Sequence, residues 1–279
     1  MLIDTHCHLD AAEFVADRDA VHAAAVAAGV GRIVLPAVAV ANFPEVKACV
    51  ARYAGCVAAY GIHPLYVMSA VEADLVVLHD WLRDERPVAV GEIGLDFYVP
   101  DLDPQRQEFF FVEQLKLARQ FNLPVLLHVR RSVDAVLKQL RRIKVAGGIA
   151  HAFNGSRQQA EVFIDLGFKL GFGGAMTYPG SSRIRELAAS LPIESIVLET
   201  DAPDIPPHWL NRGRNTPAEL PRIAQVLADL RQMDVAEVVA QTARNARQVL
   251  PGIDAMFDLG QAFENANGVD CTDRIFNRC

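Results

Sequence analysis

Short apolar runs alternate with amphipathic stretches along most of the chain. The amphipathic stretches have helical spacing, as in residues 104–121, where Phe110, Leu117 and Phe121 recur on one face, and in residues 133–143. The strand-like runs are residues 2–6, 32–38, 56–62, 87–93, 124–129, 147–153, 168–173 and 195–201. This alternation is typical of repeated βα units that build a parallel sheet.

Two further helices are predicted after the eighth run. Thr216 is the expected N-cap of the first, with Pro217 at the first helical position and Glu219 completing a capping box. Asp234 is the expected start of the second. The periodicity fades near residue 253, so we expect a domain over residues 1–252 and a tail over 253–279, packed on the domain or partly disordered.

The length agrees with one large domain. The chain has 279 residues, near the ~250 of a single α/β barrel, and 51% of them are hydrophobic, enough for a large core. No internal repeat and no linker rich in Gly, Ser or Pro divides the sequence. The predicted fold class is therefore α/β, as a single (β/α)8 TIM-like barrel with additional C-terminal helices.

The net charge and the cysteine content limit which binding partners and which cellular compartment we expect. A net charge of -7 argues against a broad basic surface, so a polyanionic substrate would have to be held locally. The sequence shows no apolar run of membrane-spanning length and no signal peptide, and nothing in it indicates an obligate protein partner. Five cysteines without a C-x-x-C motif suit a reducing compartment. We expect a cytoplasmic protein that does not associate with a membrane.

Histidine, glutamate and aspartate residues fall at the ends of the predicted strands. In a (β/α)8 barrel those ends converge on the face that carries the active site. Within an extended segment, His6 and His8 point to the same side. The residues concerned are His6, His8, His63, Glu92, His128, His151 and Asp201.

This set of donors predicts a metal centre. It suits zinc, manganese, cobalt or iron and is too rich in imidazole for a dedicated magnesium or calcium cage. Two divalent ions divide the set well if Glu92 bridges them, and we keep zinc, manganese and magnesium as candidates. One ion would be bound by His6, His8 and Asp201, and the other would be bound by His128 and His151. Two ions about 3.5 to 4 Å apart activate water, so the predicted reaction class is hydrolysis.

Seven motifs now allow a comparison with a known family. They are DTHCHLD at 4–10, GIHP at 61–64, GEIGLDFY at 91–98, HVR at 128–130, HAFNGS at 151–156, ETDAP at 199–203 and RNTP at 214–217. Over about residues 1–250 the chain resembles the TatD-type metal-dependent deoxyribonucleases of the amidohydrolase superfamily, whose fold is a TIM-like barrel. The resemblance assigns the metal ligands to His6, His8, Glu92, His128, His151 and Asp201.

The resemblance also implies an activity. Asp201 would accept the proton of the attacking water, Glu92 would serve both ions, and His63 would hold or polarise the substrate. The implied reaction is hydrolysis of phosphodiester bonds in DNA, with removal of nucleotides from 3' ends. Two departures touch the pocket rim: the sequence after His128 reads VRRS, and Asp204 stands where many relatives carry an aromatic residue.

Several alternatives remain open from the sequence. Arg130 is a candidate substrate-binding residue, since a guanidinium receives phosphate in a bidentate fork, but a rim salt bridge explains it equally. Arg131 either binds phosphate or is a solvated helix start. Glu199 shares the face of Asp201 and either orients a ligand or forms a buried salt bridge. The competing functions are a two-metal hydrolase of a small amide, ester or lactone, with a small phosphorylated or acyl substrate, and a non-catalytic metal-binding scaffold.

Overall fold

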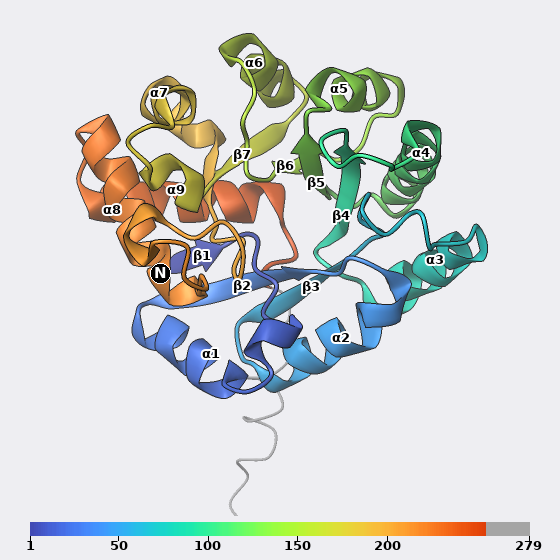
Figure 1. Cartoon of the computed structure of the whole chain (residues 1–279), viewed down its shortest axis with the longest axis horizontal. Coiled ribbons are helices and arrows are strands. Elements are labelled where there is room, and N and C mark those ends of the chain that lie inside the picture. The colour runs from blue at the N-terminus through green and yellow to red at the C-terminus, as the bar shows by residue number, and fades with distance from the viewer. Residues whose placement is uncertain (255–279) are drawn as a thin grey trace, which may run out of the picture.

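Eight parallel strands form a nearly closed barrel with helices around it (Figure 1). The computed structural model describes residues 1–254. Each strand pairs with the next one along the chain, in the order β1 to β8. The strands are β1 (Leu2–Asp4), β2 (Val30–Pro36), β3 (Cys56–Tyr60), β4 (Ala89–Asp96), β5 (Val125–Arg130), β6 (Gly148–Ala150), β7 (Phe168–Phe172) and β8 (Ile196–Leu198). The predicted (β/α)8 barrel is confirmed.

Helices follow the strands on the outside of the barrel (Figure 1). The α-helices are α1 (Arg18–Ala27), α2 (Phe43–Arg52), α3 (Ala73–Glu85), α4 (Pro104–Phe121), α5 (Val133–Arg142), α6 (Arg157–Asp165), α7 (Ser182–Ser190), α8 (Leu220–Arg231) and α9 (Val235–Val249). The 3-10 turns are η1 (Ala12–Phe14), η2 (Val40–Asn42), η3 (Gly174–Thr177), η4 (Ile193–Ser195), η5 (His208–Leu210) and η6 (Pro217–Glu219).

The core has two layers, because successive side chains of a strand point to opposite faces. Leu35, Leu127 and their equivalents pack against the surrounding helices. Val34, Leu126 and their equivalents form a separate buried cluster with α9 and the residues after it. The added C-terminal helix α9 therefore packs against the inner layer of strand side chains, which leaves the carboxyl ends of the strands to form the site.

The first and last strands meet through a few specific hydrogen bonds. Both the backbone N–H and the hydroxyl of Thr5 donate to the carbonyl of Leu198, each at 3.1 Å. The fully buried carboxylate of Asp4 accepts from the backbone N–H of Thr200 at 3.0 Å and from its hydroxyl at 2.6 Å. Burial raises the pKa of Asp4 to about 7, against the lowering effect of these bonds. We call this junction, residues 4–5 with 198–200, the seam.

All eight predicted strands are present, but several predicted boundaries are wrong. Strand β2 begins and ends two residues earlier than the predicted run over 32–38, and β3 and β8 end before residues 62 and 201. Strand β1 ends at Asp4, so His6 and His8 lie beyond it. After Asp4 the backbone no longer pairs with β2 alone, because the N–H of Thr5 donates to Leu198 on β8 and the N–H of Cys7 donates to Val34 on β2. Strand β4 continues past residue 93 to Asp96, because its end keeps pairing with β5. Strand β6 is shorter than the predicted run over residues 147–153.

The two predicted helix starts after β8 differ in outcome. Asp234 caps α9, with its carboxylate accepting from the N–H of Ala236 at 2.7 Å. Thr216 and Pro217 begin the 3-10 turn η6, the α-helix predicted to start there, α8, begins only at Leu220, and the predicted capping box is wrong. The Glu219 carboxylate instead accepts from the indole N–H of Trp209 at 2.7 Å, which removes it from the cap.

The predicted tail begins inside the described residues and continues beyond them. Ile253 is buried against the inner cluster, and Asp254 pairs with Arg32 at 3.1 Å and with Arg247 at 2.8 Å. Residues 255–279 lie outside the described part, so the division at residue 252 stays a prediction. Over residues 1–254, no helix combines the length and apolar character that crossing a bilayer requires.

The seam yields a stability prediction. Thr200→Val removes the hydroxyl that donates to Asp4 and leaves a buried carboxylate oxygen without this partner. We expect the free energy of unfolding to fall by about 1 to 3 kcal/mol, measured by urea denaturation. Thr216→Val is the matched control, because the Thr216 hydroxyl makes no cap hydrogen bond. An equal loss in both variants would contradict the role given to the seam.

Candidate metal centre

The centre is built around the carboxylate of Glu92, which is 2% exposed and lies on β4. Five imidazole nitrogens surround its two oxygens. Facing Oε1 are His128 Nδ1 at 3.1 Å, His63 Nε2 at 3.5 Å and His151 Nε2 at 3.5 Å; facing Oε2 are His6 Nε2 at 3.2 Å and His8 Nε2 at 3.8 Å. Each oxygen therefore faces its own group of nitrogen donors.

Asp201 supplies a second carboxylate on the side of Glu92 Oε2. Its Oδ1 lies 3.6 Å from His6 Nε2 and 3.7 Å from His8 Nε2. Those two imidazole nitrogens are themselves 3.3 Å apart. Asp201 follows β8 with φ of 59°, in the left-handed region, and its N–H donates to the His6 carbonyl at 2.8 Å. The seam thus holds the ends of β1 and β8 so that these three donors converge.

Burial and mutual proximity shift the pKa values strongly. Burial opposes the charged form of Glu92, but the histidines around it outweigh this and hold its pKa well below the usual range. Burial raises the pKa of Asp201 to about 6. Burial also lowers the pKa of His6 to about 3, with His151 contributing. His151 shifts the other way, to a pKa of about 10, because Asp201, Glu199 and Glu92 outweigh its burial. The cluster is a dense set of charged and neutral donors, most of them buried.

A third carboxylate orients His128. Asp96 Oδ2 lies 2.9 Å from His128 Nε2, while Asp96 Oδ1 accepts from the N–H groups of Tyr98 and Val99. Although burial opposes it, these hydrogen bonds lower the pKa of Asp96 to about 2, so the group is an acceptor. His128 Nε2 therefore carries a proton, and in the neutral ring Nδ1 turns a lone pair toward Glu92.

Glu199 lies behind His151 on the corresponding outer side, as a close charge contact without a hydrogen bond. Its Oε1 lies 3.3 Å from His151 Nδ1 and also accepts from the N–H of Ala152. His151 Nε2, the atom that faces Glu92, is then the atom free to act as a donor to a cation. A carboxylate behind the outer nitrogen of a metal-binding histidine is a common arrangement, since it fixes the ring and raises its basicity.

His63 is held in the opposite tautomer. The backbone N–H of Leu65 donates to His63 Nδ1 at 3.2 Å, so Nδ1 is the unprotonated nitrogen. Burial lowers the pKa of His63, which keeps the ring neutral. The proton must then sit on Nε2, the atom that points into the site 3.5 Å from Glu92. His63 enters the site as a hydrogen-bond donor and not as a lone-pair donor.

The structure brings all seven strand-end residues together: six of them line one cavity, and His6 lies fully buried behind them. The donor triplets with ligand atoms within 4.8 Å of one another are His6, Glu92 and His151; His6, His8 and Asp201; and His63, Glu92 and His128. The sequence grouping placed His151 with His128, whereas in the structure His151 stacks on His6 with ring centroids 3.9 Å apart. Arg130 lies at the rim with Nη1 3.9 Å from Asp96 Oδ2.

Asp96 is the functional residue that the sequence analysis missed. The predicted fourth run stopped at residue 93, which left Asp96 in a loop. In the structure Glu92 and Asp96 both lie on β4, and Asp96 pairs in register with Arg130. Continuing the period-two alternation from Glu92 for four more residues would have placed Asp96 on the same face.

The residues fit a divalent metal centre. The donors are imidazole nitrogens and carboxylate oxygens, two of the histidines have their outer nitrogens on carboxylates, and the inner atoms converge. The centre opens into a cavity of about 930 Å³. A buried group of this kind is better satisfied by cations than by hydrogen bonds alone, because several of its imidazoles face one another.

A (β/α)8 barrel with such donors at the carboxyl ends of its strands defines the class of metal-dependent hydrolases. The comparisons identify the family. The model described as "TatD related DNase" matches residues 3–251, and the chain belongs to this family.

Individual relatives agree. The chain is 42% identical over 246 residues to the metal-dependent hydrolase YjjV of Escherichia coli (strain K12), covering 87% of this chain and 95% of the relative. It is 34% identical over 261 residues to the "3'-5' ssDNA/RNA exonuclease TatD" of Klebsiella pneumoniae (strain 342), covering 91% and 98%. The crystal structure of YjjV superposes with a TM-score of 0.87 at 40% identity, covering 90% of this chain and 98% of that one. The protein is a TatD-family metal-dependent hydrolase.

The orienting role of Asp96 is testable by metal binding. Asp96→Asn keeps the shape but offers an N–H to His128, which works against the lone pair on Nδ1. We expect zinc or manganese affinity to fall by about 10- to 100-fold, measured by competition with a chromophoric chelator. Asp204→Asn is the control, because Asp204 lies on the exposed cavity rim. Wild-type affinity in Asp96→Asn would refute the assignment.

Proposed function

We propose that the protein is a two-metal 3'-5' exodeoxyribonuclease. The observation that supports this most is Glu92, whose two oxygens face separate groups of donors as a bridging carboxylate would. The name of the Klebsiella pneumoniae relative, an ssDNA/RNA exonuclease acting 3' to 5', favours a nucleic-acid end as substrate.

The proposed ligands are those expected from the sequence. Beside Glu92 Oε2, His6, His8 and Asp201 would hold one ion; beside Oε1, His128 and His151 would hold the second, with zinc, manganese or magnesium as candidates. When bound, the ions would supply a hydroxide at neutral pH and stabilise charge on the phosphoryl oxygens. The tautomer of His63 supports leaving it out of the ligand set.

Three side chains would act on water and substrate. Asp201, whose carboxylate lies beside His6 and His8 at the cavity, is placed to accept the proton of the attacking water. His63 Nε2–H would donate to a non-bridging oxygen of the scissile phosphate, where negative charge grows. Arg130, exposed at the cavity rim, would bind the same phosphate from outside.

A second candidate is hydrolysis of a small amide, ester or lactone by the same centre. The observation in its favour is the acidic part of the cavity wall, formed by Asp10, Glu13, Glu45 and Asp204. Carboxylates there repel phosphates and tolerate a neutral or acyl substrate.

We also propose the cytoplasm as the compartment. Cys7, Cys49 and Cys56, the cysteines within residues 1–254, are free and buried, as expected for a protein kept under reducing conditions.

The activity is tested with single-stranded oligonucleotides labelled at the 3' or the 5' end. With zinc, manganese or magnesium supplied, we expect stepwise shortening from the 3' end, and a loss of at least 100-fold in Asp201→Asn, which lacks the proton acceptor. Gel analysis of both labels reports polarity. DNA left intact with every metal, together with turnover of a small ester or lactone, would favour the second candidate.

Chelation separates a catalytic centre from a structural one. A catalytic centre should lose activity on metal removal and keep most of its helix signal in circular dichroism, since the barrel core is separate from the donors. Unfolding on chelation would support the scaffold alternative from the sequence analysis.

The tautomer of His63 gives a further prediction. His63→Gln should retain the wild-type metal content and lower kcat by about 10- to 1,000-fold, because it disturbs a donor to the developing oxyanion. His128→Gln, the comparison variant, should lose metal. The readouts are metal stoichiometry by elemental analysis and kcat on an oligonucleotide. Loss of one ion in His63→Gln would mean that His63 is a ligand.

A further inference from the structure

The cavity rim between β4 and β5 carries two aromatic and two cationic side chains side by side. Phe97 and Tyr98 follow β4, while Arg130 ends β5 and Arg131 follows it. The N–H of Phe97 donates to the carbonyl of Arg130 at 2.9 Å, which ties the two segments together. We call these four residues the β4–β5 rim.

Both arginines reach the ring of Tyr98. The guanidinium carbon of Arg130 lies 3.8 Å from the ring centroid, and that of Arg131 lies 4.6 Å from it. Consecutive strand residues point to opposite faces, but Arg131 has φ of 54°, a left-handed turn that breaks the alternation. Phe97 is 39% exposed and Tyr98 48%. Exposed aromatic faces beside guanidinium groups are the chemistry that holds single-stranded nucleic acid.

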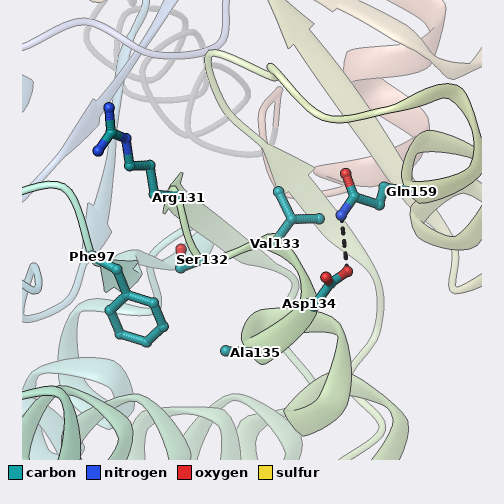
Figure 2. A pocket seen from close by; sticks show the side chains of 7 residues that line it. All are labelled: Phe97, Arg131, Ser132, Val133, Asp134, Ala135 and Gln159. Atoms are coloured by element: carbon teal, nitrogen blue, oxygen red, sulfur yellow. Dashed lines mark hydrogen bonds between the residues drawn. The ribbon is translucent and has the colours of Figure 1, made fainter.

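A second pocket lies at this rim, apart from the metal donors. Its volume of about 400 Å³ is within the ~300–1,000 Å³ of small-ligand sites. In Figure 2, Phe97 and Arg131 lie on one side of the pocket, and Asp134 and Gln159 lie on the other, joined by a hydrogen bond of 2.8 Å. Beside the paired Asp134 and Gln159, the pocket offers an aromatic ring, Phe97, and a cation, Arg131, which are partners for a base and a phosphate.

The charges around the main cavity favour this rim as the path of a strand. Arg130 is the one Lys or Arg among the described residues that line the cavity, and it stands on the β5 side. The exposed carboxylates Glu13 and Asp204 lie in the segments after β1 and β8, across the barrel from β5. Phosphates leaving the centre meet repulsion on that side and guanidinium groups at the β4–β5 rim.

We infer that the β4–β5 rim and the pocket beside it form a subsite for the nucleotide that precedes the 3'-terminal one in single-stranded DNA. Phe97 stacks on the base of that nucleotide, and Arg131 binds the phosphate on its 5' side. The strand leaves the centre over this rim. The inference rests on the proposed exonuclease function and adds the direction in which that enzyme holds its substrate.

The test compares two substrates and two pairs of variants. One substrate is a single-stranded oligonucleotide. The other is thymidine 5'-(p-nitrophenyl phosphate), which has the terminal nucleotide and the scissile bond but no preceding nucleotide. Phe97→Ala is matched by Phe109→Ala, since both side chains are 39% exposed. Arg131→Gln is matched by Arg141→Gln, an exposed arginine at the far end of α5.

We expect the ratio of kcat/KM for the oligonucleotide to that for the ester to fall about tenfold in Phe97→Ala and in Arg131→Gln. Phe109→Ala and Arg141→Gln should keep the wild-type ratio. Fluorescence anisotropy with the metal-depleted full chain gives a second readout. There, Arg131→Gln should reduce the slope of log affinity against log salt by about 0.7, the loss of one phosphate contact.

The failures are distinguishable. A wild-type ratio and salt slope in both test variants, or equal changes in the controls, would overturn the subsite and leave the exonuclease standing. If the wild-type enzyme cleaves no DNA while oligonucleotide binding still depends on Phe97 and Arg131, the proposed function fails and the binding site stands. If neither substitution changes the affinity for the oligonucleotide, the subsite is overturned, whether or not the enzyme cleaves DNA.

Discussion

The buried carboxylate of Glu92 imposes the constraint that the rest of the site satisfies. An ionised group removed from water is costly unless positive charge or polarised hydrogens surround it. Here five imidazole rings from the ends of four strands do so, and the burial that would neutralise the group is outweighed by them. His6 and His8 follow β1, and β3, β5 and β6 contribute one ring each. Only a position near the barrel axis is within reach of all four strand ends, so the fold and the carboxylate depend on each other.

The imidazole rings around Glu92 are in turn oriented by contacts at their outer nitrogens. Asp96 fixes the proton of the neutral His128 ring on its outer nitrogen, and Glu199 lies 3.3 Å from the outer nitrogen of His151, while a backbone N–H fixes the proton of His63 on the inner nitrogen. Histidines thus enter one cavity with opposite hydrogen-bonding character. In the proposed function this difference would separate the histidines that hold a cation from the one that holds a phosphate oxygen, and it arises from neighbours two or more residues away along the chain.

The sequence predicts the fold and seven of the residues that meet at the centre, because residue type and position relative to apolar runs decide both; Asp96, at the end of β4, is the exception. The sequence predicts the ends of the strands less well, because backbone pairing between neighbouring strands sets them. The extension of β4 to Asp96 depends on its register with β5, and the end of β1 depends on carbonyls of its two neighbours. The tautomers and the left-handed turn at Arg131 are set by contacts that no local pattern records. The capping box at Thr216 failed because Trp209 competes for Glu219.

The seam has a consequence for biosynthesis. Asp4 and Thr200 are separated by 196 residues, so β1 emerges from the ribosome with one of its two lateral neighbours still unsynthesised. Until β8 is made, the nascent sheet has an unpaired edge, and Asp201 is missing from the donors beside His6 and His8. Completion of the barrel and assembly of the ion site are therefore the same late event. A chain released before that point carries most of the ligands but no centre.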